Sequence, residues 1–218
     1  MKTVTDLNLT HFFLYIWRMN LKAKSSQEIF QTIFVCILTL LCLIFLIPLI
    51  ILLSVSIKLT GRGPVIYSQK RIGRNGKPFI IYKFRSLHIG TEDGFPLISG
   101  KEDKRITIPG RFMRKHKFDE IPNLFNVLKG EMSIIGPRPE QQIFIDQIIQ
   151  REPRYKQLQL IKPGITSWGQ VKYGYASNVE EMIKRMEYDL FYLENRSLIF
   201  DLKIALSTIA IILKGKGI

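Results

Sequence analysis

Residues 115–140 read KHKFDEIPNLFNVLKGEMSIIGPRPE, and this stretch carries two adjacent carboxylates, Asp119 and Glu120. Apolar residues at helical spacing follow over residues 121–128, and Gly130 is placed to end that helix. The sequence therefore predicts a helix directly after the two acids. In that position Asp119 is a candidate N-cap, because the first turn of a helix leaves backbone N–H groups without an intrahelical partner.

Positive charge surrounds the two acids. Four basic residues precede them: Arg111, Arg114, Lys115 and Lys117. Further along, two prolines restrict the backbone on both sides of Arg138. A helix N-terminus beside Lys and Arg favours phosphate ligands, and an ionised Asp can attack phosphorus while an adjacent Glu holds Mg²⁺. The stretch indicates a site for phosphate chemistry, with a purely structural cap at Asp119 as the alternative.

The string FDEIPNLFNVLKGEMSIIGPRP, at 118–139, resembles the core signature of the bacterial sugar transferases. The group in question is the small monotopic polyprenyl-phosphate phosphoglycosyl transferases, which initiate surface-glycan assembly. Three further segments match the family pattern in the same order: QKRIGRNGKPFIIYKFRSL at 69–87, KPGITSWGQV at 162–171 and YDLFYLENRSLIFDLKIALSTI at 188–209. With the apolar run that precedes them, they extend the resemblance over roughly residues 30–213.

The resemblance implies an enzyme that moves a phosphosugar from a UDP-sugar to polyprenyl (undecaprenyl) phosphate. Its products would be a polyprenyl-diphosphate-linked sugar and UMP, in the first membrane step of exopolysaccharide, lipopolysaccharide or capsule synthesis. Asp119 would be the nucleophile that forms a covalent aspartyl-phosphosugar intermediate. Glu120 would ligate Mg²⁺, which neutralises the diphosphate. The sugar, the glycan pathway and the oligomeric state do not follow from the resemblance.

The resemblance also implies which side chains bind phosphate. These are Lys83, Arg85, Arg114 and Arg138, each of which falls on a position of the family motif. For the first two the residues alone leave an alternative open. Lys83 and Arg85 alternate about Phe84, as the solvated face of a half-buried strand would.

Three other site candidates come from the C-terminal half. Residues 162–170 read as a turn-rich loop, in which Thr166 and Gln170 would form a wall of the nucleotide-sugar site and Trp168 is either wall or core anchor. Asp189 matches an acid of the family pattern, although its position alone fits a charge on a helix surface equally well.

An apolar run dominates the N-terminal part. Residues 33–57 carry no charge, and at about 1.5 Å per residue they are long enough to cross a hydrocarbon core. Basic residues flank the run on both sides, which favours the cytoplasm for both ends, and Pro48 removes one helical hydrogen bond where the chain could turn back. A spanning helix and a re-entrant one both fit the residues. The resemblance implies a re-entrant helix that breaks at Pro48.

The remaining sequence suggests a mostly helical α+β fold in three parts. Residues 1–30 form an extension, either interfacial or packed on the domain, and residues 31–58 form the membrane helix. The resemblance implies that residues 59–218 form a cytoplasmic catalytic domain at the bacterial inner membrane. Asn75-Gly76 predicts a β-hairpin between residues 65–72 and 79–84. Helices are expected at 107–117, 140–150, 178–195 and 198–213, the last an interfacial amphipathic helix, with an exposed loop, a possible lid, at 90–104.

Composition limits the partners. The net charge is +14, from 32 Lys and Arg against 18 Asp and Glu, so the partners are expected to be anionic: lipid or phosphorylated substrates. A nucleic-acid binder is not expected, because the apolar anchor does not suit one and aromatics are not interleaved with the basic residues. Cys36 and Cys42 lie in the apolar run and predict no disulfide. The competing class is a non-catalytic, membrane-anchored anion-binding scaffold for a glycan assembly complex.

Overall fold

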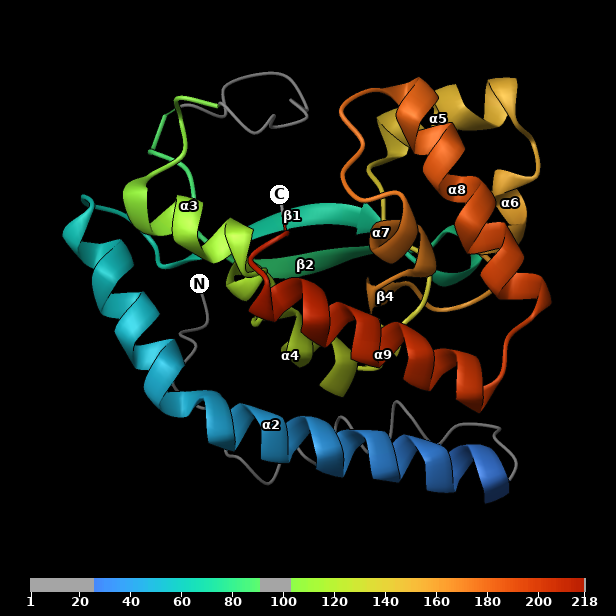
Figure 1. The fold of residues 1–218 in the computed structure, drawn as a ribbon, viewed down its shortest axis with the longest axis horizontal. Coiled ribbons are helices and arrows are strands. Elements are labelled where there is room, and N and C mark those ends of the chain that lie inside the picture. Colours follow the sequence, from blue (N-terminus) through green and yellow to red (C-terminus); the bar gives the residue numbers. More distant parts are fainter. Residues whose placement is uncertain (1–25, 91–102, 218) are drawn as a thin grey trace, which may run out of the picture.

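The computed structural model describes residues 26–90 and 103–217. Within these ranges the chain is mostly helical, with a central antiparallel hairpin and a second, very short pair of strands. Figure 1 places the hairpin between α3 (Ile108–Lys115) on one side and a group of helices on the other: α5 (Gln142–Arg151), α6 (Tyr155–Leu158) and α8 (Val179–Glu194). The mostly helical α+β fold expected from the sequence is confirmed. The expectations for residues 1–25 and for most of the 90–104 loop lie outside the described residues.

The apolar run forms the long helix α2, Ser26–Leu59, which contains Pro48. Its segment Thr32–Leu59 is the one helix among the described residues that is long and apolar enough to cross a membrane. The helix continues without interruption through Pro48, so it is not broken there, and Figure 1 shows a bend in α2 beyond which the helix turns toward α3. Such a bend follows from the proline ring, which removes one backbone hydrogen bond without ending the helix. Neither Cys36 nor Cys42 forms a disulfide in the described ranges.

One side of α2 packs on the rest of the molecule along most of its length. Val35 contacts the cluster around Val127, and Leu43 packs with Leu128. Near the C-terminal end, Leu53 and Ile57 are buried with Phe84 and Met113. Both ends of the apolar run therefore contact the same folded unit, while many side chains on its other faces are exposed.

The central hairpin consists of β1, Ile66–Ile72, and β2, Pro78–Phe84. The strands pair from Ile66↔Phe84 to Ile72↔Pro78. Asn75 and Gly76 both have positive φ, 57° and 69°, in a 3-10 turn between the strands. The hairpin expected from that dipeptide is confirmed, since asparagine and glycine are the residues that tolerate this backbone conformation.

The two acids lie in a short 3-10 turn, η3 (Phe118–Glu120), between α3 (Ile108–Lys115) and α4 (Asn123–Leu128). Thr107 caps α3 by accepting a hydrogen bond from Gly110 N–H at 3.0 Å. The helix expected directly after the acids begins only at Asn123, and its N-cap position, Pro122, has no side-chain cap. Asp119 is therefore not an N-cap, and the structural interpretation of this residue is wrong.

The C-terminal half starts with β3 (Ser133–Ile135), which pairs in parallel with β4 (Gly164–Thr166). The sequence predicted a turn-rich loop at 162–170, but the structure has strand β4 and the start of the next helix there. The strand was not predicted because a ladder of two residue pairs is too short to show strand periodicity. The helices of this half are α5 (Gln142–Arg151), α6 (Tyr155–Leu158), α7 (Trp168–Lys172), α8 (Val179–Glu194) and α9 (Leu198–Leu213).

Polar N-caps set the starts of the last three helices. Ser167, Asn178 and Ser197 accept hydrogen bonds from Gln170 N–H, Glu181 N–H and Phe200 N–H at 3.0, 2.9 and 3.2 Å. Trp168 is a core anchor: it is buried with Tyr192 of α8 and Ile204 of α9. Most other apolar side chains of α9 face outward: Leu198, Ile199, Leu202, Leu206, Ile209 and Leu213. Helix α9 therefore presents an exposed apolar surface, as expected of an interfacial helix.

Candidate active site

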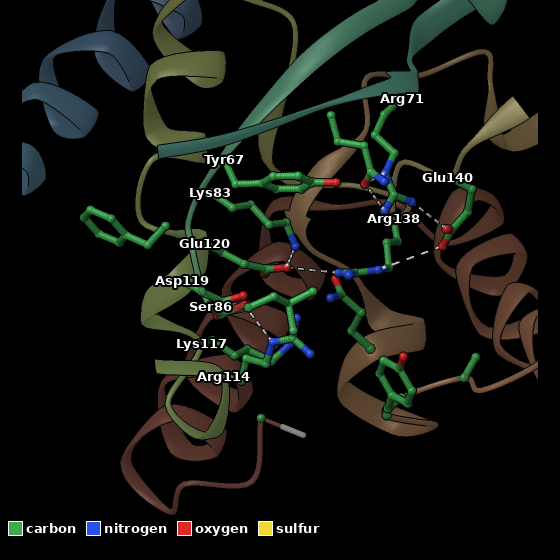
Figure 2. Close-up of a pocket in the computed structure, with 18 of the residues that line it drawn as sticks. Tyr67, Arg71, Lys83, Ser86, Arg114, Lys117, Asp119, Glu120, Arg138 and Glu140 are labelled. Carbon is green, nitrogen blue, oxygen red and sulfur yellow. Dashed lines mark hydrogen bonds and ion pairs between the residues drawn. The ribbon is translucent and has the colours of Figure 1, made fainter. Parts of the chain in front are cut away.

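A cavity of about 210 Å³ opens between the hairpin, the turn after α3 and helix α8. It contains Asp119 and Glu120 (Figure 2). Its lining is strongly basic, with three carboxylates, Asp119, Glu120 and Glu140, against nine cations: Arg71, Lys83, Arg85, Arg105, Arg114, Lys117, Arg138, Arg185 and Lys216. Such an excess of positive charge in a concave site favours a multiply charged anion such as a diphosphate.

Glu120 is held by two cations from distant parts of the chain. Lys83 Nζ lies 2.6 Å from Glu120 Oε1, and Arg138 donates to the same oxygen at 3.2 Å (Figure 2). Burial alone would raise the pKa of Glu120, but Lys83, Arg138 and Lys117 outweigh it and hold that pKa well below its usual range. Glu120 is therefore an ionised carboxylate of fixed position.

Asp119 differs from its neighbour. Among the residues the structure describes, its carboxylate makes no hydrogen bond or ion pair, although its side chain is only 9% exposed and lines the cavity. Burial raises the pKa of Asp119, Lys83 opposes the rise, and the adjacent charge of Glu120 adds to it. An unpartnered carboxylate that faces an anion-binding cavity is the arrangement a nucleophile requires, because no bond must break before it attacks.

Two further basic side chains lie on the same side of the cavity as Asp119. Arg114 donates from Nε to Ser86 Oγ at 2.9 Å, which orients the guanidinium and leaves its terminal nitrogens without a hydrogen bond in the described part of the chain. Lys117 has the left-handed backbone conformation, with φ of 55°, just before the 3-10 turn. Burial lowers its pKa. Arg114 thus lies where the sequence placed it, beside the two acids.

Arg85 lines the cavity, but its guanidinium binds the end of α2. It donates to the carbonyl oxygens of Ile57, Gly61 and Arg62 at 3.1 to 3.2 Å. Carbonyls at the end of a helix lack intrahelical partners, and a cation there also suits the helix dipole. These contacts give Arg85 a structural role at the junction of α2 with the hairpin, in addition to its place at the cavity wall.

The three C-terminal candidates lie in different places. Gln170 lines the cavity, is 7% exposed, and has a buried side-chain oxygen with no hydrogen-bond partner. Thr166 lies outside the cavity lining and shares a hydrogen bond with Thr208 of α9 at 2.8 Å. Asp189 also lies outside the lining, but it is not a surface charge: it is 3% exposed, and its Oδ1 accepts from Gly169 N–H at 2.7 Å. Burial raises the pKa of Asp189 to about 6.

A buried ion network on the opposite wall did not follow from the sequence. Glu140 Oε1 lies 2.6 Å from Arg185 of α8, and Glu140 Oε2 lies 3.2 Å from Arg71 of β1. Arg138 lies between Glu120 and Glu140, and its Nε is 3.9 Å from Glu140 Oε1 (Figure 2). One feature of the sequence could have indicated that Arg71 points inward. Arg71 lies four residues after Tyr67 on the same face of β1, and the residues of this face alternate with exposed ones.

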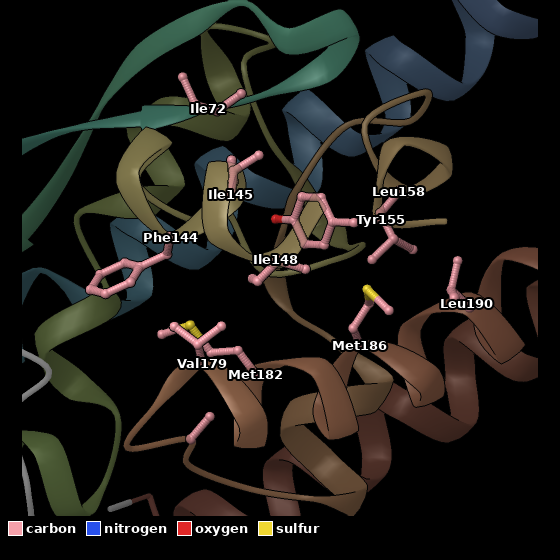
Figure 3. Close-up of a cluster of buried hydrophobic side chains, with 11 residues drawn as sticks. Ile72, Phe144, Ile145, Ile148, Tyr155, Leu158, Val179, Met182, Met186 and Leu190 are labelled. Carbon is pink, nitrogen blue, oxygen red and sulfur yellow. The ribbon is translucent and has the colours of Figure 1, made fainter. Parts of the chain in front are cut away.

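Hydrophobic packing holds this wall in place. Helix α8 carries Arg185, and its neighbours Met182 and Met186 pack with Ile145 and Ile148 of α5 (Figure 3). Both methionines lie in the helix predicted for residues 178–195. The fixed position of α8 explains how a guanidinium 45 residues distant in sequence reaches Glu140.

The fold and site define a class of protein, and comparison of the sequence identifies it. Residues 26–215 match the family described as bacterial sugar transferase, and the chain belongs to that family. A UDP-N-acetylgalactosamine-undecaprenyl-phosphate N-acetylgalactosaminephosphotransferase of Aeromonas hydrophila is 42% identical over 170 residues, 78% of this chain and 40% of the relative. A UDP-glucose:undecaprenyl-phosphate glucose-1-phosphate transferase of Klebsiella pneumoniae is 38% identical over 175 residues, 79% of this chain and 38% of the relative.

Relatives of different length share the matched region. The chain spans about two-fifths of the length of the two relatives named above. A sugar transferase of Bacillus subtilis, EpsL, described as uncharacterized, is 36% identical over 170 residues, and the match covers 80% of that shorter protein. The names of the first two relatives specify different sugars on the same lipid phosphate.

Proposed function

We propose that this chain transfers a phosphosugar from a UDP-sugar to undecaprenyl phosphate, forming an undecaprenyl-diphosphate-linked sugar and UMP. The observation that carries the proposal is a cavity lined by nine cations in which Asp119, without a partner in residues 26–90 and 103–217, lies next to the ion-paired Glu120. The names of the relatives support the class of donor and acceptor. A non-catalytic scaffold would not need a buried carboxylate without a partner, since such a group destabilises the fold.

In the first step, an Asp119 carboxylate oxygen attacks the sugar-bearing phosphorus of the donor. A new bond forms between that oxygen and phosphorus, the bond from phosphorus to the bridging oxygen breaks, and UMP leaves with the electron pair. In the second step, a phosphate oxygen of the lipid attacks the same phosphorus, and Asp119 departs as a carboxylate. Both steps move charge among phosphate oxygens, so catalysis depends on positioned cations.

Six of the cations form three pairs with separate tasks in this mechanism. Lys83 and Arg138 neutralise Glu120 and fix it beside the nucleophile. Arg114 and Lys117 lie by Asp119 and are available to the transferring phosphoryl group. Arg71 and Arg185 surround Glu140 on the opposite wall and place positive charge where the nucleotide phosphate or the lipid phosphate can lie.

The residues present fit a Mg²⁺ ion that is bound together with its substrate. The described residues contain no group of three or more His, Cys, Asp or Glu that could hold a metal by themselves. Glu120, however, is ionised, and its Oε2 makes no hydrogen bond in the described residues, because Lys83 and Arg138 both bind Oε1. One such carboxylate with phosphate oxygens and water is a common Mg²⁺ ligand set. Mg²⁺ bound there would neutralise charge on the diphosphate.

We also propose that α2 is a re-entrant anchor at the cytoplasmic face of the inner membrane. Supporting it, Val35 near one end of the apolar run and Ile57 at the other both pack on the catalytic unit. A straight helix that spanned the bilayer would separate these residues by the hydrocarbon core of roughly 30 Å. The bend in α2 and the exposed apolar side chains of α9 are consistent with a shared membrane surface.

The test is UMP release by the purified, detergent-solubilised full chain. It is incubated with undecaprenyl phosphate and, in separate reactions, UDP-glucose, UDP-N-acetylglucosamine, UDP-galactose and UDP-N-acetylgalactosamine. We expect UMP release with at least one donor, and transfer of the labelled sugar phosphate into the lipid phase. Absence of lipid-linked product with every donor would contradict the proposed function.

A further inference from the structure

The segment after α9 returns to the catalytic cavity. Helix α9 ends at Leu213, and Gly215 takes the left-handed conformation, with φ of 59°. Lys216 N–H donates to Ile211 O at 3.0 Å, and Gly215 N–H donates to Ile212 O at 3.2 Å, the hydrogen-bond pattern of a Schellman cap. This cap turns the chain sharply back toward the end of α3.

Backbone contacts fix the returning segment against α3. Gly217 N–H donates to Lys115 O at 2.8 Å, and His116 Nδ1 lies 2.7 Å from Ile212 O. A Cβ at Gly217 would lie 2.3 Å from Arg114 O, so only glycine permits this approach. A Cβ at Gly215 would likewise lie 2.7 Å from the Lys115 side chain. The segment is therefore fitted to α3 at both glycines.

The residue between these two glycines is Lys216. Both Lys216 and Gly217 line the cavity that contains Asp119, and Gly217 lies against the backbone of Arg114. Lys216 makes no ion pair with a carboxylate among residues 26–90 and 103–217. A cation held at the cavity by a fitted backbone, without a carboxylate partner there, is positioned for an anion from outside the protein.

We propose that Lys216 is a further substrate-binding residue, whose ammonium group contacts a phosphate of a substrate in the Asp119 cavity. The proposal rests on the proposed function for the identity of the substrate, which supplies phosphate from either the UDP moiety or the lipid acceptor. The match to the sugar transferase family ends at residue 215, so Lys216 is a feature of this chain beyond the matched region. Because the C-terminal cap of α9 positions Lys216, the contact between Lys216 and phosphate would also connect α9 to the cavity.

The experiment measures affinity separately for UDP and for undecaprenyl phosphate, with the full chain in detergent. Four variants are compared with the wild type: Lys216→Ala, Lys216→Arg, Lys214→Ala and Gly217→Val. Lys214 is the matched control, because it is an exposed lysine two residues away that does not line the cavity. Gly217→Val leaves the charge in place and displaces the segment from Arg114 O.

We expect Lys216→Ala to weaken one of the two ligands by about tenfold, and that ligand identifies the source of the phosphate. Lys216→Arg should restore affinity to within about twofold, Lys214→Ala should have no effect, and Gly217→Val should match Lys216→Ala. Unchanged affinity for both ligands in Lys216→Ala, or no binding of either by the wild type, overturns the proposal. If the wild type binds UDP but transfers no sugar phosphate, the proposed function fails, while the affinities still decide the role of Lys216.

Discussion

Lys83 Nζ lies 2.6 Å from Glu120 Oε1, which joins the end of the hairpin to the turn after α3 across 37 residues of sequence. This ion pair, with Arg138 on the same oxygen, provides Glu120 with partners, while Asp119 has none among the residues that the structure describes. Two neighbouring carboxylates thereby acquire opposite properties: one is ionised and fixed, and the other is buried and open to the cavity. The predictions below follow from this difference and from the way α2 is attached.

Asp119→Asn should abolish turnover without unfolding the protein. The amide keeps the shape of the side chain but cannot attack phosphorus as a carboxylate does. We expect UMP release to fall by about a thousandfold or more, and the covalent phosphosugar adduct to disappear from the intact-protein mass spectrum. Retained turnover in a folded Asn variant would exclude covalent catalysis at this position.

The same variant should be more stable than the wild type at alkaline pH. Burial raises the folded-state pKa of Asp119 above the usual 3.8, so the folded state holds this proton more tightly than the unfolded state does. The contribution of Asp119 to stability is therefore greatest at low pH and is lost as the pH rises above the unfolded value. We expect the Asn variant to melt about 2 °C or more above the wild type at pH 8, and to lose this advantage toward pH 4.

Glu120→Gln is the control, because its effect on stability at pH 8 should be opposite to that of Asp119→Asn. Its folded-state pKa is lowered, so its stabilising contribution is present above the unfolded pKa and is lost as the pH falls toward the folded one. At pH 8 the Gln variant should melt below the wild type, because Lys83 and Arg138 lose their shared partner. A higher melting temperature in both variants at pH 8 would contradict the assigned difference between the acids.

Chelation of divalent metal should reproduce the catalytic defect of Glu120→Gln. If Glu120 holds Mg²⁺ against the diphosphate, EDTA and the amide substitution both remove that charge neutralisation. We expect UMP release to fall steeply in both cases, and added Mg²⁺ to restore only the chelated wild type. Full turnover of the wild type in EDTA would rule out the metal role.

Arg85→Ala should act mainly through stability. The variant removes the donors to Ile57 O, Gly61 O and Arg62 O at the end of α2, which corresponds to a loss of about 1–3 kcal/mol in the free energy of unfolding. Affinity for UDP should change by less than about threefold. Lys70→Ala, on the exposed face of β1, is the control. A large loss of UDP affinity at an unchanged melting temperature would instead make Arg85 a phosphate ligand.

Thiol labelling tests the topology of α2. Single cysteines at Lys24 and Arg62, in a background without Cys36 and Cys42, should both be shielded from a membrane-impermeant reagent in intact cells. Both should react after the inner membrane is opened, since basic flanks favour the cytoplasmic side. Labelling of either position from outside would indicate a spanning helix.

Pro48→Leu extends this test. The substitution restores the missing backbone hydrogen bond and favours a straight helix of about 37 Å over the uncharged run, enough to span. We expect one flank to become accessible from outside and UMP release to fall, because the catalytic unit loses its placement. An unchanged labelling pattern and unchanged activity would mean that Pro48 does not set the topology.

Local signals in the sequence determined most of the secondary structure. Asn75-Gly76 specified its turn through backbone conformation, and the helical pattern of residues 178–195 predicted helix α8. The motif residues also identified the acids and the cations Lys83, Arg114 and Arg138, which the fold brings to one cavity. Turns and helical periodicity depend on residues within a few positions of one another, so they can be predicted from a single sequence.

Tertiary structure alone decided which polar groups have partners. Asp119 was an N-cap candidate by its neighbours, but the chain enters a 3-10 turn there, and the ion pairs of Glu120 come from Lys83 and Arg138. The Arg71–Glu140–Arg185 network and the return of Lys216 to the cavity join positions far apart in sequence. Hydrophobic periodicity specifies which face of an element is buried, but not which distant charge will face it, because that depends on how the elements pack.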